Sequence, residues 1–363
     1  MSLALGIIGM PNVGKSTLLN ALAHAHAEAT NYPFCTIEKN VGVVAVEDAR
    51  LHDLAAALEP KEVTPATIEF VDIAGLVKGA SQGEGLGNKF LGHIRDVDAL
   101  IHVVRCFRDE NVAHVSGRVD PVADLEIVET ELLLADLESL NRITERLHTE
   151  SKANPKGVQA DLERVGRLIA SVERGVPLRR LGDLDPAQRA WAREYRLLSI
   201  KPVVIVANVD EDDPQGAGWV ERLRASAGND AEVLATPIRI EEELSTLSPE
   251  ERAAFVAEMH LEGAGLERVV EAGRRLLGLI TFYTIAHEKL RAWLIPAGTP
   301  APRAAGRIHT DMEHGFIRME VMSVNDVLAH RTRGALHKLG LIRTEGHEYI
   351  VQDGDVCQIL FGA

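Results

Sequence analysis

Gly9-Met-Pro-Asn-Val-Gly14-Lys15-Ser16-Thr17 decides the fold of this chain, because it has the glycine spacing of a phosphate-binding loop. Before it, the apolar run Ala4–Ile8 predicts a buried strand. After it, leucines at helical spacing between Ser16 and Ala25 predict a helix. A strand, a glycine loop and a helix in this order are the context that the motif requires. A chance glycine turn is the alternative, and both flanking elements argue against it.

The loop offers a separate group to each part of a bound triphosphate. Its glycines let main-chain N–H groups turn toward the β- and γ-phosphates, and Lys15 adds a positive charge at the same oxygens. The hydroxyl of Ser16 can ligate Mg²⁺. The positive end of the dipole of the following helix favours the anion as well.

Length, cysteine use and charge restrict the class of protein. The 363 residues suffice for roughly two or three domains, and no apolar run of about 18 residues predicts a membrane span. The N-terminus lacks a basic leader, so we interpret it as a strand and not as a signal peptide. Three widely spaced cysteines disfavour disulfides or a zinc site and favour the cytoplasm. Because the formal net charge is −15, we expect no DNA partner, and an RNA partner would need a local basic patch or a protein-rich assembly.

Strand patterns alternate with helical ones along the first 280 residues. Apolar runs at 67–71, 99–104, 202–207 and 231–235 predict strands, and 88–95 predicts a helix. This alternation predicts an α/β fold with a doubly wound parallel sheet that helices cover on both faces.

Two long helical patterns interrupt this alternation. Residues 122–147 are rich in Leu and Glu, with leucines along one face, and Asn154-Pro-Lys-Gly157 ends the pattern. A second helix follows and ends at Gly175-Val-Pro177. The pair predicts an antiparallel hairpin or coiled-coil arm. Packing of both helices on the sheet is the alternative.

The chain after residue 280 changes to short segments separated by turns, which predicts a small α+β domain. Gly315–Val321 alternates as a half-buried strand does, and we expect Tyr349–Val351 and Val356–Phe361 to pair around the turn at Asp353-Gly354. Basic residues form either an RNA-facing patch or a solvated face here, since acidic residues balance much of their charge: Arg331, Arg333, Lys338 and Arg343.

Asp72-Ile-Ala-Gly75 follows the strand at 67–71 and completes the predicted phosphate site. An Asp at the carboxyl end of a strand beside the loop can hold Mg²⁺, usually through water, and the N–H of Gly75 can reach the γ-phosphate. Thr36 lies where nucleotide switches place a threonine on Mg²⁺, although an ordinary loop threonine fits equally well. The many glycines between Lys78 and Gly87 predict a segment that the γ-phosphate orders.

Asn208-Val-Asp-Glu211 ends the strand at 202–207, where GTPases carry N-K-x-D. The Asp of that motif accepts hydrogen bonds from N1–H and the 2-amino group of guanine, and adenine offers neither donor. The longer arm of Glu211 moves its oxygens elsewhere. We therefore predict loss of guanine selectivity, with Asn208 or main-chain groups at the adenine edge. A GTPase that tolerates Glu211 is the alternative.

Leu76 stands where Ras-like GTPases place the glutamine that orients the attacking water. Leucine cannot do this, so either another group contacts the water or turnover is slow. His114, in the loop 109–117, and His93 are the candidates. The plainer interpretations are a solvated loop histidine for His114 and a packing role in its helix for His93.

These motifs, together with Gly306–Asp311, Gly315–Arg318 and Asp353-Gly-Asp355, resemble the YchF subfamily of Obg-like NTPases over nearly the whole chain. The resemblance implies a P-loop NTPase (G) domain over 1–280, which a helical coiled-coil arm interrupts at 118–198. It implies a TGS domain, a β-grasp-like module, over 281–363.

The resemblance also implies function. It implies preference for ATP over GTP and a link to the translation machinery. It implies Ser16 and Thr36 as Mg²⁺ ligands. It also implies phosphate contacts from Asn12, Val13, Gly14, Lys15, Ser16 and Thr17, and base contacts from Asn208, Val209 and Glu211. Asp72 completes the predicted metal site, and Lys15, Gly75 and His114 are the predicted catalytic residues.

The predicted protein is a cytoplasmic, monomeric, Mg²⁺-dependent ATPase that acts as a switch on the large subunit or the whole ribosome, through rRNA or ribosomal protein. An Obg-like GTPase is one alternative. The other is a nucleotide-gated ribosome- or RNA-binding module with negligible turnover, which Leu76 keeps open.

Overall fold

The computed structural model describes residues 3–27, 40–73, 86–258 and 265–362. The chain divides into two compact units. The first contains the N-terminal segment as far as Ala25 and the chain from Glu69 to Gly273. The second contains Val43–Ile68 and the chain from Arg274 onward. The sequence pattern did not predict that 43–68 joins the C-terminal part.

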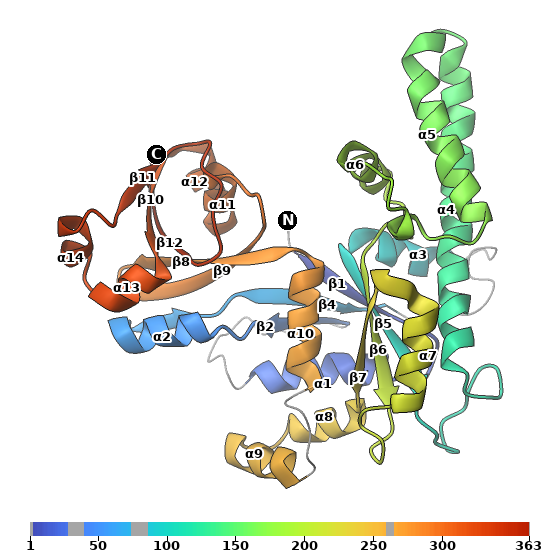
Figure 1. Ribbon diagram of the computed structural model, residues 1–363, viewed down its shortest axis with the longest axis horizontal. Helices are drawn as coiled ribbons and strands as arrows, with labels where there is room; N and C mark the ends of the chain where they lie inside the picture. Colours follow the sequence, from blue (N-terminus) through green and yellow to red (C-terminus); the bar gives the residue numbers. More distant parts are fainter. Residues whose placement is uncertain (1–2, 28–39, 74–85, 259–264, 363) are drawn as a thin grey trace. The chain divides into compact units, whose positions relative to one another are not determined.

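One six-stranded sheet has the order β2-β4-β1-β5-β6-β7 (Figure 1), and β1, β5, β6 and β7 lie wholly in the first unit. Strands β1, β4, β5, β6 and β7 run parallel. Every residue of β1, β5 and β6 is buried, as in strands that are covered on both faces. The predicted α/β sheet is thus confirmed, with strands β1 (Ala4–Ile8), β2 (Val41–Ala45), β4 (Thr67–Asp72), β5 (Ala99–Cys106), β6 (Val203–Val209) and β7 (Glu232–Thr236).

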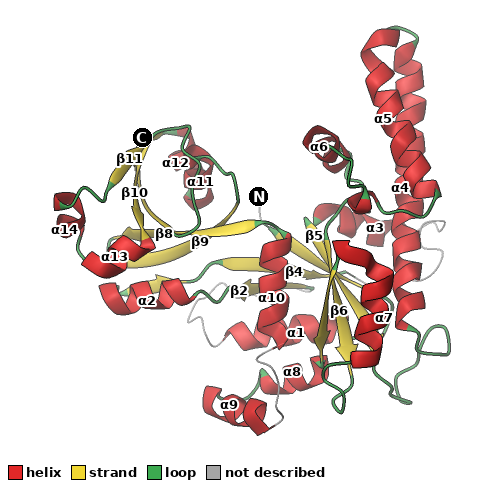
Figure 2. Ribbon diagram, viewed as in Figure 1, coloured by secondary structure: helices red, strands yellow, loops and turns green. Residues whose placement is uncertain are grey.

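Helices lie on both faces of this sheet (Figure 2). On one face, Leu125 of α4 and Val220 and Leu223 of α7 pack against β5, β6 and β7. On the other, α10 packs so closely that a Cβ at Gly273 would lie 2.4 Å from Cδ1 of Leu5. The helices are α1 (Lys15–Ala27), α3 (Leu86–Asp96), α4 (Pro121–Ser151), α5 (Pro155–Glu173), α6 (Pro186–Glu194), α7 (Ala217–Ala227), α8 (Ile238–Leu244), α9 (Pro249–Glu258) and α10 (Gly265–Leu276).

The predicted arm is formed by α4 and α5. The first turns of α4 cover the sheet, and the rest of the helix extends beyond it to pair with α5 (Figure 1). Leu140 and Ile143 of α4 pack against Val165 and Leu168 of α5 in one hydrophobic cluster. The hairpin and the sheet-packing interpretation therefore each describe part of α4. None of the described helices is long and apolar enough to cross a bilayer.

A buried carboxylate fixes the chain that returns from the arm. Asp136 of α4 is 1% exposed and accepts hydrogen bonds from the N–H of Leu198 at 2.6 Å and from the N–H and hydroxyl of Ser199 at 2.8 and 2.6 Å. Leu198 and Ser199 are buried, so these donors could not bond to water if the carboxylate were removed, and the loss would destabilise the fold. Asp136 therefore attaches the segment before β6 to the arm helix.

We expect Asp136→Ala to lower the free energy of unfolding by about 2–4 kcal/mol, because it leaves three buried donors without their acceptor. Urea denaturation measures this. The matched control is Asp183→Ala, whose side chain is 71% exposed and pairs with Arg167. The control should change stability by less than about 1 kcal/mol. Equal losses in the two variants would contradict the anchoring role.

The second unit contains a six-stranded sheet in the order β11-β10-β12-β8-β9-β3. Strands β8 and β9 form an antiparallel hairpin, and β12 runs parallel to β8 and antiparallel to β10. The expected α+β class is confirmed, with elements α2 (Ala49–Leu58), β3 (Glu62–Thr64), β8 (Leu279–Ala286), β9 (Lys289–Pro296), α11 (Ala301–Ile308), α12 (Thr310–His314), β10 (Phe316–Ser323), α13 (Val324–His330), α14 (Arg333–Lys338), β11 (Arg343–Glu345) and β12 (Asp355–Phe361).

One predicted strand pair is wrong. Tyr349–Val351 is not a strand partner of β12 and makes only an isolated bridge between Ile350 and Pro300. Strand β12 pairs with β10 and β8 instead. The side chain of Asp353 accepts from the N–H of Thr281 at 2.9 Å and pairs with Arg50, so the predicted turn connects to neighbours far away in the sequence. Local periodicity could not show these long-range partners.

Candidate functional site

The glycine loop follows β1 directly, and two of its glycines are required by geometry. Gly9 has φ +147°, and a Cβ there would lie 2.3 Å from the carbonyl oxygen of Val103. Gly14 has φ +102°, and a Cβ there would lie 2.6 Å from Nδ2 of Asn208. Helix α1 begins at Lys15, next to this loop. The N–H groups of its first turn and its dipole therefore point at the concavity of the loop, which suits an anion.

Lys15 lies back over the loop. It is 7% exposed, and its Nζ donates to the carbonyl oxygen of Met10 at 2.8 Å. Burial lowers the pKa of Lys15, and the carboxylate of Asp72 acts in the opposite direction. Asp72 thus favours the charged ammonium that a phosphate would meet.

Ser16 and Asp72 meet at the end of β4, as the sequence predicts. The hydroxyl of Ser16 donates to Oδ2 of Asp72 at 2.5 Å. Oδ1 of Asp72 is buried and has no hydrogen-bond partner among the described residues. An orphaned carboxylate oxygen beside a serine hydroxyl fits Mg²⁺, which takes oxygen ligands and commonly binds through one or two carboxylates and substrate phosphates. Thr36, Gly75 and Leu76 lie outside the described residues.

Asn208 connects the loop to the far end of the sheet. It is 7% exposed at the end of β6, and its Nδ2 donates to the carbonyl oxygen of Val13 at 3.0 Å. Its Oδ1 accepts from the N–H of Ile238 at 3.2 Å. Both ends of the amide are therefore used within the protein, which gives Asn208 a structural role beside the loop.

Glu211 differs from Asn208 in being about half exposed. It faces Arg239 at 3.5 Å, and Arg239 also pairs with Glu243 at 3.7 Å. Val209, between the two motif residues, is buried in the core. The carboxylate of Glu211 is thus available at the surface, and a cation lies beside it.

His114 is held against the arm helix. Its Nε2 lies 2.9 Å from Oδ2 of Asp124, and its Nδ1 accepts from the N–H of Ser116 at 3.1 Å. The side chain is 7% exposed, so it is not the solvated loop histidine of the plainer interpretation. Because Nδ1 accepts a hydrogen bond, Nε2 carries the proton in the neutral ring. His93, the other candidate, is exposed on α3.

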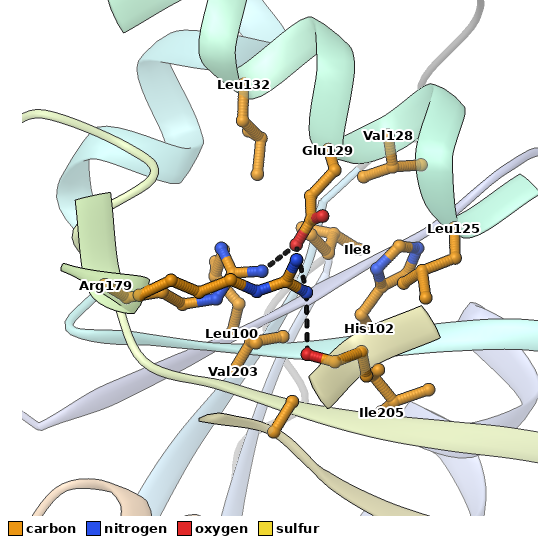
Figure 3. A pocket seen from close by; sticks show the side chains of 13 residues that line it. Ile8, Leu100, His102, Leu125, Val128, Glu129, Leu132, Arg179, Val203 and Ile205 are labelled. Carbon is orange, nitrogen blue, oxygen red and sulfur yellow. Dashed lines mark hydrogen bonds and ion pairs between the residues drawn. The ribbon is translucent and has the colours of Figure 1, made fainter. Parts of the chain in front are cut away.

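Apart from the phosphate loop, a cluster of polar side chains lies between α4 and β5 (Figure 3). Arg179 forms ion pairs with Glu129 of α4 and with Asp230. His102 of β5 lines the same cavity of about 10 Å³, and burial lowers its pKa to about 3, so the ring is neutral. A cavity of this size holds about one water molecule. The ion pairs therefore attach α4 to the segments that carry Arg179 and Asp230, and the cavity is too small to be a nucleotide site.

Sequence reasoning missed the residues that support the site. Asp124 has no motif around it, and its role as the partner of His114 is visible only in the fold. Arg105 stands out as a charged residue in a mainly apolar strand, but the sequence does not show what it contacts. Both lie next to the loop that carries His114.

The fold and the site together define a phosphate-loop nucleotide-binding protein of the GTPase class. A family model described as 50S ribosome-binding GTPase matches residues 4–147, and one described as a protein of unknown function matches 279–362.

Full-length relatives narrow this class. The chain is 45% identical to the ribosome-binding ATPase YchF of Escherichia coli O157:H7 over 363 residues, with 99% of both chains covered. It is also 45% identical to that of Bacillus subtilis over 365 residues, with 99% of this chain and 100% of the relative covered. The structure of the YchF GTPase of Schizosaccharomyces pombe matches with a TM-score of 0.85 and 34% identity, covering 99% of this chain and 98% of that one. The chain therefore belongs to the YchF family, as its motifs predict.

Proposed function

We propose that this chain is a Mg²⁺-dependent ATPase that works as a conformational switch on the ribosome. The contact between Ser16 and Asp72, together with the orphaned Oδ1 of Asp72 and the effect of this carboxylate on Lys15, is the observation that carries the proposal. The bacterial relatives, named ribosome-binding ATPases, support it at 45% identity over the full chain. The partner is the large subunit or the whole ribosome, met in the cytoplasm by a monomer.

Each residue of the site has a separate task in this proposal. The amides from Asn12 to Thr17 and the ammonium of Lys15 bind the phosphates. Ser16, Thr36 and Asp72 hold Mg²⁺, with Asp72 acting through water. When bound, the ion neutralises charge on the phosphate oxygens. Gly75 donates its N–H to the γ-phosphate, and His114 orients the attacking water.

The preference for ATP depends on Glu211. An aspartate at this position would accept from N1–H and the 2-amino group of guanine, and the longer glutamate carries its oxygens past that point. Because the amide of Asn208 is used by Val13 and Ile238, main-chain groups are left to contact the adenine edge. A GTPase is the competing proposal, since the Schizosaccharomyces pombe relative is named as one.

We expect ATP to bind at least tenfold more tightly than GTP, and Glu211→Asp to reduce this ratio by about tenfold, because it restores the guanine acceptor. Competition of both nucleotides against a fluorescent analogue measures the ratio. Glu243→Asp is the matched control, since Glu243 pairs with the same Arg239 and should leave the ratio unchanged. Tighter binding of GTP by the unmodified protein would refute the proposed specificity.

A binding module with incidental hydrolysis is the second candidate, and Leu76 favours it. In the C-terminal unit, Arg333 pairs with Glu320 and Arg343 with Glu345, which lowers the charge that this segment offers to RNA. Two measurements separate the candidates: the ATPase rate with and without ribosomal subunits, and ribosome binding with and without nucleotide. Stimulation of the ATPase rate by ribosomes supports the switch, and ribosome binding that does not respond to nucleotide supports the module.

A further inference from the structure

Arg105 is a buried cation whose hydrogen bonds to the described residues all go to main-chain carbonyls. It is 2% exposed near the end of β5. Its guanidinium donates to Phe107 at 3.3 Å, Asp109 at 3.0 Å and Val112 at 2.9 Å, and lies 4.5 Å from the centre of the Phe107 ring. Burying a guanidinium costs free energy, and the carbonyls of the surrounding loop offset that cost by accepting its hydrogen bonds.

The loop that Arg105 holds also contacts the phosphate loop, through Ala113, the residue after Val112. The carbonyl oxygen of Ala113 accepts from Nδ2 of Asn12 at 3.2 Å. Asn12 has φ +60°, a left-handed conformation that asparagine tolerates better than most residues. One side of the loop is therefore fixed by the sheet through Arg105, and the other contacts the glycine loop through Asn12.

The residue after this contact is His114, which Asp124 of α4 holds at 2.9 Å. The imidazole uses both ring nitrogens, on Asp124 and on the N–H of Ser116. Contact with an attacking water therefore requires the ring to exchange one partner. The main chain on its N-terminal side stays held by Arg105 and Asn12 during that exchange.

We propose that Arg105 is a positioning residue for hydrolysis: it holds the loop 107–113 so that His114 is presented beside the phosphate loop. The inference rests on the proposed function, because Arg105 acts through His114. It is 2% exposed and its guanidinium faces the carbonyls of Phe107, Asp109 and Val112, so we expect it not to contact the nucleotide. Its effect therefore falls on the rate of the chemical step and not on nucleotide affinity.

The test measures kcat and KM for ATP in the full-length protein with Mg²⁺. Arg105→Gln should lower kcat about tenfold or more and leave KM within about twofold, because misplacement of a catalytic group by about 1 Å already costs up to 100-fold. The double variant Arg105→Gln/His114→Ala should be no slower than His114→Ala alone, since both changes remove the same contact. Arg268→Gln is the matched control, because Arg268 also donates to a main-chain carbonyl, that of Ala235. This variant should retain the kcat of the unmodified protein.

Arg105→Lys keeps the charge and covers the case in which the glutamine variant does not fold. A single ammonium cannot serve three carbonyls in the geometry of the guanidinium fork, so an intermediate kcat is expected, with faster hydrogen exchange at 107–113. Full kcat in either folded variant would overturn the inference on Arg105 and leave the proposed function standing. The same holds if the double variant loses kcat by the product of the two single losses. A wild-type protein that does not hydrolyse ATP would overturn the proposed function and this inference with it.

Discussion

Lys15→Ala should reduce kcat for ATP hydrolysis by roughly 10²–10³-fold, the range for loss of one preorganised charge at a reacting phosphate. Lys15 is the buried cation of the phosphate loop, and in this structure its Nζ is held by the carbonyl of Met10. Alanine leaves the main-chain cradle in place and removes the charge. The expected result is therefore a folded protein with weak triphosphate binding and almost no turnover, which a phosphate-release assay measures.

Lys201→Ala is the matched control. Lys201 is also a lysine whose pKa burial lowers, and its Nζ donates to main-chain carbonyls of Arg95 and Val97 away from the loop. The control should lose stability and keep its turnover. Ribosome association is measured for Lys15→Ala in the same experiment. If that association does not change with loss of turnover, the switch is wrong and the binding module is the better account.

The sheet was predictable because buried parallel strands are continuous apolar runs. Strands β1, β5 and β6 lie where such runs occur, and each is buried at every residue. The phosphate loop was predictable for a different reason, since its glycines meet conformational and steric limits that leave a fixed spacing. Of the predicted site, Lys15, Ser16 and Asp72 are brought together because they lie at or just after the carboxyl ends of the neighbouring parallel strands β1 and β4.

What the sequence did not predict depends on contacts between distant segments. Strand β3 is only three residues long and has a single apolar residue, Val63. Its pairing with β9 is supported by ion pairs of Glu62 with Lys289 and Arg291. No hydrophobic period marks such a strand. The amide of Asn208 is a similar case, because its partners are Val13 of the phosphate loop and Ile238 at the start of α8. Motif spacing identifies Asn208 as important but not what it contacts.

Asp72→Asn has the second largest expected effect. We expect it to raise the Mg²⁺ concentration for half-maximal ATP hydrolysis about 10–100-fold, the usual cost of changing an outer-sphere partner of a bound metal. The amide keeps the shape of the carboxylate but removes its charge, and its nitrogen is a donor that cannot face a hydrated cation. The loss also removes the charge that favours the ammonium of Lys15, so kcat at saturating Mg²⁺ should fall too.

Titration of the ATPase rate with Mg²⁺ separates these two effects, because metal affinity moves the midpoint and the Lys15 effect lowers the plateau. Asp98→Asn is the matched control: Asp98 is also an aspartate that accepts a hydrogen bond in this unit, from the N–H of Ala4 at 3.1 Å. Its midpoint should stay that of the unmodified protein. An unshifted midpoint in Asp72→Asn would mean that the orphaned Oδ1 does not face the ion. The metal would then have to be held by Ser16, Thr36 and the phosphates alone, and Asp72 would act only as the acceptor that orients Ser16.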